Sequence, residues 1–246
     1  PQIVAGRHLA AVPRRLEAPI DPVEVDADEL VLLAHLLGDG CVLPRQPIHY
    51  TSNDPANLEA VEAAAARRFG ITPRRVIQES WWHTYLPAPQ HLTHGVRNPI
   101  STWWDHLGLR DCRSWQKFVP HLVHQAPLHQ VQLFLRHLWA TDGTISLSAS
   151  GKGPQVRIMY ATTSRQLADD VQRLLLRCGI QSRISVVPQG RHRPSHHVRI
   201  EGVDHQRRFL EEVGVHGRRG ERCGPALGRP AGIVANPNVD TIPSEV

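Results

Sequence analysis

The sequence predicts an α+β protein built from two similar halves, and two observations support this prediction. Two mainly apolar segments, LLAHLLGDG at 32–40 and FLRHLWATDG at 134–143, each end in Asp-Gly. After each of them the chain reads as strands, an amphipathic helix that ends in Gly-Ile, more strands, and a helix that ends in Leu-Gly or Val-Gly. Self-similarity along a chain indicates a repeated structural unit, and this order of helices and strands indicates a mixed α+β fold.

Corresponding positions in the two halves are similarly spaced. Asp39 and Asp142 are 103 residues apart. In the first half, the glycine that ends the next helix, Gly70, lies 31 residues after the aspartate. In the second half, the corresponding glycine, Gly179, lies 37 residues after it. A Thr-Ser-Asn-Asp run precedes the first of these helices and a Thr-Ser pair precedes the second. These residues favour helix N-caps, as glycine favours helix ends, so both helices have defined boundaries.

The two apolar segments predict a pair of buried helices. A helix that is apolar nearly all round must be buried, and the best partner of the helix over 30–37 is its counterpart over 131–140. Packed side by side, they bring Asp39 and Asp142 together at the negative ends of two helix dipoles, where the carboxylates repel each other. A hard divalent cation such as Mg²⁺ would relieve that repulsion. The alternative, two unrelated Asp-Gly turns, is disfavoured by the repeat that surrounds both.

Alternating side chains in the second half predict strands with one apolar and one polar face. In QVRIMYAT at 155–162, Val156, Ile158 and Tyr160 share one face, and Gln155, Arg157 and Met159 lie on the other. The strands that contain Arg183 and Arg199 alternate in the same way. Three such strands favour a basic groove lined by a sheet over an ordinary solvated sheet face.

Composition and charge narrow the class of protein. The chain of 246 residues is 41% hydrophobic and has a net charge of +5, a basic balance that points weakly to nucleic acid. Its four cysteines are far apart, and neither C-x-x-C nor H-E-x-x-H occurs, so the sequence indicates neither a disulfide framework nor a zinc site. There is no run of 18 apolar residues and no signal-peptide pattern, which predicts a cytoplasmic protein that does not enter the membrane.

Both Asp-Gly stretches resemble the LAGLIDADG motif, and the two copies together resemble a single-chain LAGLIDADG homing endonuclease. LLAHLLGDG is close to the form found in intein-embedded members, with Leu37 at the first acidic position of the motif and Asp39 at the metal-binding position. Ala140 and Asp142 stand at these positions in the second copy. QKFVP is similar to the Lys-x-x-Pro block of intein endonucleases, so Lys117 corresponds to the family's active-site lysine.

The resemblance implies two αββαββα units, at 28–127 and 128–225, in a monomer with internal pseudo-twofold symmetry. Their two antiparallel sheets would form a saddle over double-stranded DNA. Arg222 stands three residues before a proline, as Lys117 does. The implied catalytic residues are Asp39, Asp142, Lys117 and Arg222. The implied ligands of Mg²⁺ are Asp39, Asp142, Gly38 and Thr141. The implied DNA-binding residues, on polar faces of the sheets, are Arg45, His49, Arg75, Arg157, Arg183 and Arg199.

The activity that the resemblance implies is a metal-dependent double-strand break at a long, specific DNA sequence during intein homing. Residues 1–27 and 226–246 resemble the segments that join such an endonuclease to a splicing domain. Position 1 is Pro and the chain ends in Ser-Glu-Val, so an endonuclease without its protein-splicing ends is expected. The alternative function is that of a non-cleaving LAGLIDADG protein: a decayed endonuclease, an RNA-splicing maturase or a DNA-binding regulator.

Overall fold

The computed structural model describes residues 15–17, 19–92, 96–150 and 153–228. Much of the two flanking segments predicted at 1–27 and 226–246 lies outside the described residues. The elements of the first unit are α1 (Ala27–Asp39), β1 (Gly40–Cys41), β2 (His49–Ser52), α2 (Pro55–Phe69), β3 (Arg74–Ile77), β4 (Trp82–Tyr85) and α3 (Pro99–His106). Those of the second unit are α5 (Leu128–Asp142), β5 (Gly143–Ser150), β6 (Gly153–Thr162), α6 (Arg165–Arg177), β7 (Ser182–Gln189), β8 (His192–Ile200) and α7 (Val203–Arg208), which continues into a π-helical turn η2 (Phe209–Val213).

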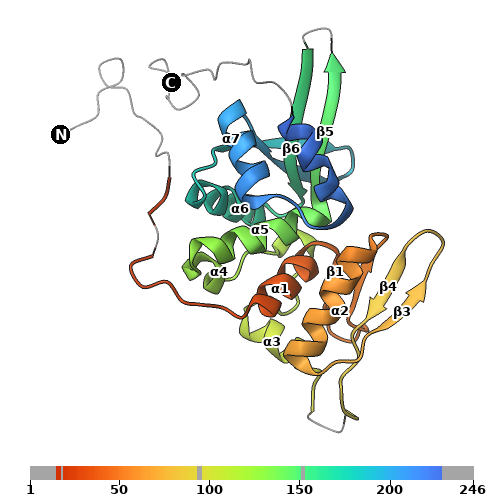
Figure 1. Cartoon of the computed structure of the whole chain (residues 1–246). Coiled ribbons are helices and arrows are strands. Elements are labelled where there is room, and N and C mark those ends of the chain that lie inside the picture. The colour runs from red at the N-terminus through yellow and green to blue at the C-terminus, as the bar shows by residue number, and fades with distance from the viewer. Residues whose placement is uncertain (1–14, 18, 93–95, 151–152, 229–246) are drawn as a thin grey trace.

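Both units form the same antiparallel sheet. The strand order is β1-β2-β4-β3 in the first and β5-β6-β8-β7 in the second, which confirms the predicted pair of αββαββα units. In Figure 1 the first unit lies below and the second above, with α1 and α5 between them. The strands of the first sheet have only two to four residues, against eight to ten in the second. The alternating pattern seen in the second half therefore corresponds to the longer sheet.

The two apolar helices form the centre of the core, as predicted. Leu32, Leu33 and Leu36 on α1 are fully buried. On α5, Leu135 and Leu138 are fully buried. The helices cross closely near their C-terminal ends, because a Cβ atom added at Gly38 would collide with the side chain of Thr141. A residue without a side chain is thus needed where the two backbones meet.

The second helix of each unit begins and ends as the sequence predicts. Asp54 caps α2 by accepting a hydrogen bond from the Ala56 N–H at 3.1 Å, and Gly70 ends it with φ of 64°. Ser164 caps α6 by accepting from the Leu167 N–H at 3.1 Å. Short connectors complete each unit: η1 (Ser114–Gln116) and α4 (His121–Gln125) in the first, η3 (Gly217–Arg222) and α8 (Cys223–Leu227) in the second. No described helix has the length and apolar content needed to cross a membrane.

Candidate active site

Asp39 and Asp142 are the last residues of α1 and α5, and the chain leaves both helices abruptly. Gly40 and Gly143 follow them in extended conformation and start the first strand of each sheet. A Cβ atom at Gly40 would collide with the backbone of Leu36. The Asp-Gly sequence is therefore what lets the chain turn from a buried helix directly into a sheet while the carboxylate stays at the helix end.

The two carboxylates share one electrostatic environment. Burial raises the pKa of Asp39 to about 7, the nearby Asp142 raises it further, and Arg219 and Lys117 oppose the shift. Burial also raises the pKa of Asp142, against the effect of Lys117 and Arg219. Solvent still reaches both residues, so the site is a concave one in which protein atoms replace much of the hydration. Such a site disfavours two negative charges unless a cation joins them.

Lys117 reaches the end of α1. Its ammonium donates hydrogen bonds to the carbonyl oxygens of Leu37 at 2.8 Å and Gly38 at 3.3 Å. Burial lowers the pKa of Lys117, while Asp142 and Asp39 raise it. The Lys117 carbonyl accepts a hydrogen bond from the Ser164 hydroxyl at 2.6 Å. Because Ser164 caps α6, a residue near the C-terminal end of the first unit is held in place by the second.

Arg219 occupies the equivalent position at the end of α5. Its guanidinium donates to the carbonyl oxygens of Thr141 and, at 2.6 Å, of Gly143. These residues correspond by the repeat to Gly38 and Gly40, whose carbonyl oxygens both accept from Lys117. Its neighbour, Arg218, donates its backbone N–H to the Asp54 carboxylate that caps α2, at 2.7 Å. Both basic residues thus lie near the C-terminal end of one unit, in a segment that is held at the second helix of the other unit.

Arg222 does not occupy the place that its spacing from Pro225 predicts. Its guanidinium donates to the Ile145 carbonyl on β5 at 3.0 Å, beyond the end of α5. The reason lies in local conformation, because Pro225 is inside the short helix α8 whereas Lys117–Pro120 is extended. The GRRGERCG run offers several arginines without periodicity, so only the folded chain distinguishes Arg219 from Arg222.

Two cavities of different chemistry lie at the helix ends. One of about 360 Å³ is lined by Lys117, Asp142 and the hydroxyl residues Ser114, Thr162 and Thr163, among others. The other, of about 300 Å³, is lined by Gly143, Thr144, Ile145, Arg218, Arg219 and Arg222. The first combines a lysine with hydroxyl groups, and the second is an arginine cluster.

The aspartate pair fits a divalent cation that keeps other ligands. In the described part of the chain, no three His, Cys, Asp or Glu residues are arranged to hold a metal. The carbonyls of Gly38 and Thr141, predicted as ligands, accept hydrogen bonds from Lys117 and Arg219. The carboxylates are then the principal donors, which suits Mg²⁺, since that ion is commonly held by one or two carboxylates plus waters and phosphate oxygens.

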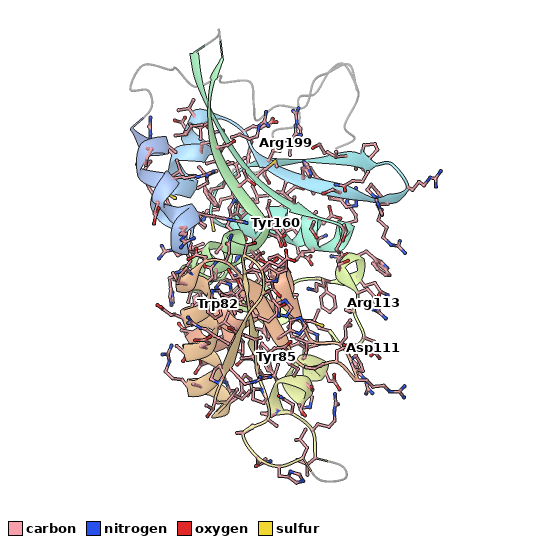
Figure 2. All side chains as sticks on the ribbon, turned by 90° about the vertical axis from the view of Figure 1, so that its right-hand side faces the viewer. Trp82, Tyr85, Asp111, Arg113, Tyr160 and Arg199 are labelled. Carbon is pink, nitrogen blue, oxygen red and sulfur yellow. The ribbon has the colours of Figure 1, made fainter. Side chains whose placement is uncertain are left out.

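The second sheet places its three predicted arginines on one face. Arg199 pairs in register with Arg183 on β7 and with Met159 on β6, two residues from Arg157. All three arginines are exposed. Figure 2 labels Arg199 on this sheet and Tyr85 on the first sheet. The prediction of a sheet face that carries arginine is confirmed.

The first sheet corrects one predicted residue. Arg75 makes a two-pronged ion pair with Glu62 of α2, at 2.6 and 2.8 Å, so it faces the helix and not the open side of the sheet. Arg74 takes the open face, with its guanidinium carbon 5.1 Å from the centre of the Tyr85 ring. His49 lies beside Tyr85 and stacks on His83, with ring centres 4.9 Å apart. Arg45 lies in the loop between β1 and β2, with φ of 63°.

A buried histidine pair joins the two units, and the sequence did not reveal it. His35 of α1 and His137 of α5 share a hydrogen bond of 3.0 Å between Nε2 and Nδ1. The other His35 nitrogen lies 3.0 Å from the Tyr50 hydroxyl, and His137 stacks on His216 with ring centres 4.4 Å apart. These contacts account for a polar residue at this buried position of α5.

These histidines predict loss of stability in acid. Burial lowers the pKa of His137 from 6.5 to about 3, and it lowers that of His35 in the same direction. Their neutral forms therefore stabilise the fold above pH 6.5, and this contribution is lost as the pH falls. For His137 the loss at pH 5 is about 2 kcal/mol. The free energy of unfolding, measured by chemical denaturation, should therefore differ less between pH 8 and pH 5 in His137→Gln than in the wild type.

The matched control is His106→Gln, which changes an exposed histidine and should keep the pH dependence of the wild type. Comparing each variant with itself at the two pH values removes any general loss of stability caused by the substitution. An unchanged pH dependence in His137→Gln would show that this histidine does not titrate on unfolding.

Comparisons with known proteins agree with this architecture. Residues 129–214 match the family described as LAGLIDADG-like domain. The fold is similar to that of I-DmoI in complex with DNA and Mn, with a TM-score of 0.52 and 10% identity over 76% of this chain and 96% of that chain. It is also similar to full-length DUF199/WhiA from Thermatoga maritima, with a TM-score of 0.51 and 11% identity over 87% of this chain and 64% of that chain.

Three curated relatives are much longer than this chain. Replicative DNA helicase DnaB of Rhodothermus marinus is 42% identical over 98% of this chain and 26% of its own length. DnaB of Nostoc sp. is 43% identical over 86% of this chain and 24% of its own length. Protein RecA of Mycobacterium tuberculosis is 28% identical over 85% of this chain and 28% of its own length. The chain thus spans about a quarter of the length of these relatives. Residues 129–214 match the LAGLIDADG-like domain, and the described chain adopts the LAGLIDADG fold in both of its units.

Proposed function

We propose that this chain is a site-specific DNA endonuclease that cuts both strands by metal-dependent phosphodiester hydrolysis. The observation that carries the proposal is the pair Asp39 and Asp142, held side by side at the ends of α1 and α5 with raised pKa values. A basic residue lies beside each helix end, Lys117 at one and Arg219 at the other. Two acidic and two basic groups on a pseudo-twofold axis suit a duplex, whose two strands run in opposite directions.

Each group has a distinct task in this proposal. Asp39 and Asp142 would hold Mg²⁺, which when bound supplies Lewis-acid stabilisation of the charge that develops on phosphate oxygens. Lys117, whose pKa is lowered by burial, would orient or deprotonate the attacking water. Arg219 would bind phosphate oxygens through its planar fork. The hydroxyls of Ser114 and Thr162 in the Lys117 cavity would help to position water.

The relatives support an intein as the setting of this activity. DnaB and RecA have different names, yet each matches most of this chain over only about a quarter of its own length. A segment that is shared by differently named proteins and has its own fold is best explained as an insert. We therefore propose that the chain is the endonuclease part of an intein and that its target is the host gene without the insert.

Cleavage of that target tests the proposal. A supercoiled plasmid that carries the uninterrupted host-gene sequence should be converted to linear DNA with Mg²⁺ and remain intact in EDTA. A plasmid that carries the same gene with the insert should remain intact under both conditions. Binding to the uninterrupted sequence without any nick would favour the alternative, a non-cleaving LAGLIDADG DNA-binding protein.

The raised pKa of Asp39 predicts how Mg²⁺ affects stability. The unfolded carboxyl ionises near 3.8 and the folded one near 7, so without metal the site costs stability as the pH rises through this range. Mg²⁺ should offset that cost when both carboxylates are ionised. Mg²⁺ should therefore raise the midpoint temperature of thermal unfolding more at pH 8 than at pH 5.5, by about 2–4 °C for each kcal/mol of binding.

At each pH, the midpoint temperature with Mg²⁺ is compared with the midpoint temperature without it. This comparison is needed because the buried histidines change stability with pH in the opposite direction. In Asp39→Asn the rise at pH 8 should be largely lost. An equal effect of Mg²⁺ on the wild type and on this variant would place the metal elsewhere.

A further inference from the structure

The positive charge of the chain is concentrated in the second unit. Residues 28–127 contain nine Lys or Arg and nine Asp or Glu, so their net charge is zero. Residues 128–225 contain fifteen Lys or Arg and eight Asp or Glu, a net charge of +7. Five arginines of each unit form ion pairs, so the units differ in net charge and not in how much of their charge is paired. The pairs are Arg67–Asp28, Arg68–Glu29, Arg75–Glu62, Arg97–Asp105 and Arg110–Asp105 in the first unit, and Arg165–Asp169, Arg173–Asp170, Arg183–Glu201, Arg207–Asp204 and Arg208–Glu212 in the second.

The open faces of the two sheets differ in charge, and the more positive face again belongs to the second unit. We call the exposed residues Arg157, Arg183 and Arg199 of the second sheet the arginine face. Arg183 lies 3.8 Å from Glu201 and keeps 78% of its side chain exposed, so it remains available to an anion. The hairpin between β7 and β8 adds another exposed arginine, Arg191, at the far end of these two strands.

The open face of the first sheet is mostly uncharged. We call its residues His49, His83, Tyr85 and Arg74 the histidine face. The two histidine rings stack nearly parallel, at 12°, and burial together with the neighbouring His49 lowers the pKa of His83. Arg74 is the one charged residue of this face, and it lies over the Tyr85 ring.

The arginine face is fixed relative to the helix ends. Arg193, near the start of β8, places its guanidinium carbon 4.0 Å from the centre of the Trp115 ring. Trp115 belongs to η1, two residues before Lys117. A cation–π contact of this kind links the second sheet to the segment that carries Lys117. The contact therefore ties the sheet that carries the arginine face to the segment that places Lys117 at the helix ends.

We propose that the second unit anchors the DNA and the first unit contacts its half-site with little net charge. This inference rests on the proposed function and adds a division of labour to it. Arginine forks bind phosphates and can pair with the O6 and N7 atoms of guanine, so the half-site of the second unit should hold the specific guanines. The stacked histidine rings and Tyr85 suit base-edge contacts that release few counterions.

Salt dependence of DNA binding tests the anchor. The full chain would be titrated, in EDTA to prevent cleavage, against a fluorescent 40-bp mixed-sequence duplex between 50 and 200 mM salt. Each phosphate contact contributes about 0.9 to the slope of log affinity against log salt. The triple variant Arg157→Ala, Arg183→Ala, Arg199→Ala should lower the slope by about 2 to 3 and weaken binding at least about 10-fold at 100 mM salt.

Two further triple variants provide the comparison. His49→Ala, Arg74→Ala, His83→Ala should change affinity less than about 3-fold and the slope by about 1 or less. Arg165→Ala, Arg173→Ala, Arg207→Ala removes the same charge from helices of the second unit, where the side chains are 62%, 63% and 51% exposed. It should also change affinity less than about 3-fold. Thermal unfolding confirms that each variant is folded.

The results separate this inference from the proposed function. If the histidine-face variant loses as much affinity or slope as the arginine-face variant, the anchor is wrong while DNA binding stands. If the helix variant loses as much as the arginine-face variant, only the total charge matters and the anchor is again wrong. If the wild type does not bind the duplex at any salt concentration, both the inference and the proposed function fall.

Discussion

Replacement of Asp39 or Asp142 by asparagine is expected to reduce double-strand cleavage by at least about 10³-fold, a loss typical of removing a principal charge-stabilising group from an active site. DNA binding should stay within a few-fold of the wild type. Asparagine keeps the shape of the side chain but removes its charge, so the site can no longer hold Mg²⁺ between two carboxylates. Binding is retained because the exposed sheet residues, and not these carboxylates, would contact the DNA.

The two substitutions should also spare the fold. Each removes one of two negative charges at adjoining helix ends, where burial raises the pKa of both carboxyl groups. Metal-free Asp39→Asn is therefore expected to be at least as stable as the wild type at pH 8. Asp111→Asn is the matched control, since Asp111 is an exposed aspartate of the first unit, and it should cleave like the wild type. Cleavage by Asp39→Asn or Asp142→Asn at the wild-type rate would remove the aspartates from the mechanism.

Lys117→Ala is expected to slow the cutting of one strand by about 100-fold or more, within the 10²–10⁴-fold that a positioned acid or base contributes. Nicked circles should then accumulate in a plasmid assay. The reason is the difference between the two cavities. The Lys117 cavity combines hydroxyl groups with an amine whose pKa burial lowers, whereas the Arg219 cavity is an arginine cluster that can stabilise charge but cannot accept a proton.

Arg219→Ala should slow the opposite strand by a smaller factor, about 10-fold, because it removes charge stabilisation without removing a base. Arg222→Ala should have the least effect of the three, since this side chain contacts the Ile145 carbonyl and not a helix end. Lys117→Arg should cut its strand as slowly as Lys117→Ala does, while Arg219→Lys should recover part of the rate that Arg219→Ala loses. End-labelling each strand separately measures these effects. Equal slowing of both strands by Lys117→Ala would contradict the assignment of one residue to one strand.

The repeat made the architecture predictable from the sequence. Two copies of an apolar helix that ends in Asp-Gly predicted the crossing of α1 and α5, and short-range signals such as Ser164 and Gly70 predicted the helix boundaries. The confirmed arginine face followed from strict alternation in β6, β7 and β8. Each of these features depends on local chemistry that is visible within a few residues.

The missed features depend on contacts that are distant in sequence. Arg74 and Arg75 are neighbours, and only the pairing of Arg75 with Glu62 on α2 decides which of them faces the open side of the sheet. Arg219 could not be distinguished within its Gly- and Arg-rich run, because the acceptors that select it lie on α5 and β5. The pairing of His35 with His137 spans 102 residues.

The central claim is that the paired aspartates form a metal-dependent centre for cutting both strands of DNA. The most direct measurement follows each strand of an end-labelled duplex that carries the uninterrupted host-gene sequence, with Mg²⁺ and with EDTA, for the wild type and Asp39→Asn. The account predicts one defined cut on each strand by the wild type with Mg²⁺, and no cut in EDTA or by the variant. Intact strands under every condition, despite binding of the wild type to the duplex, would contradict it.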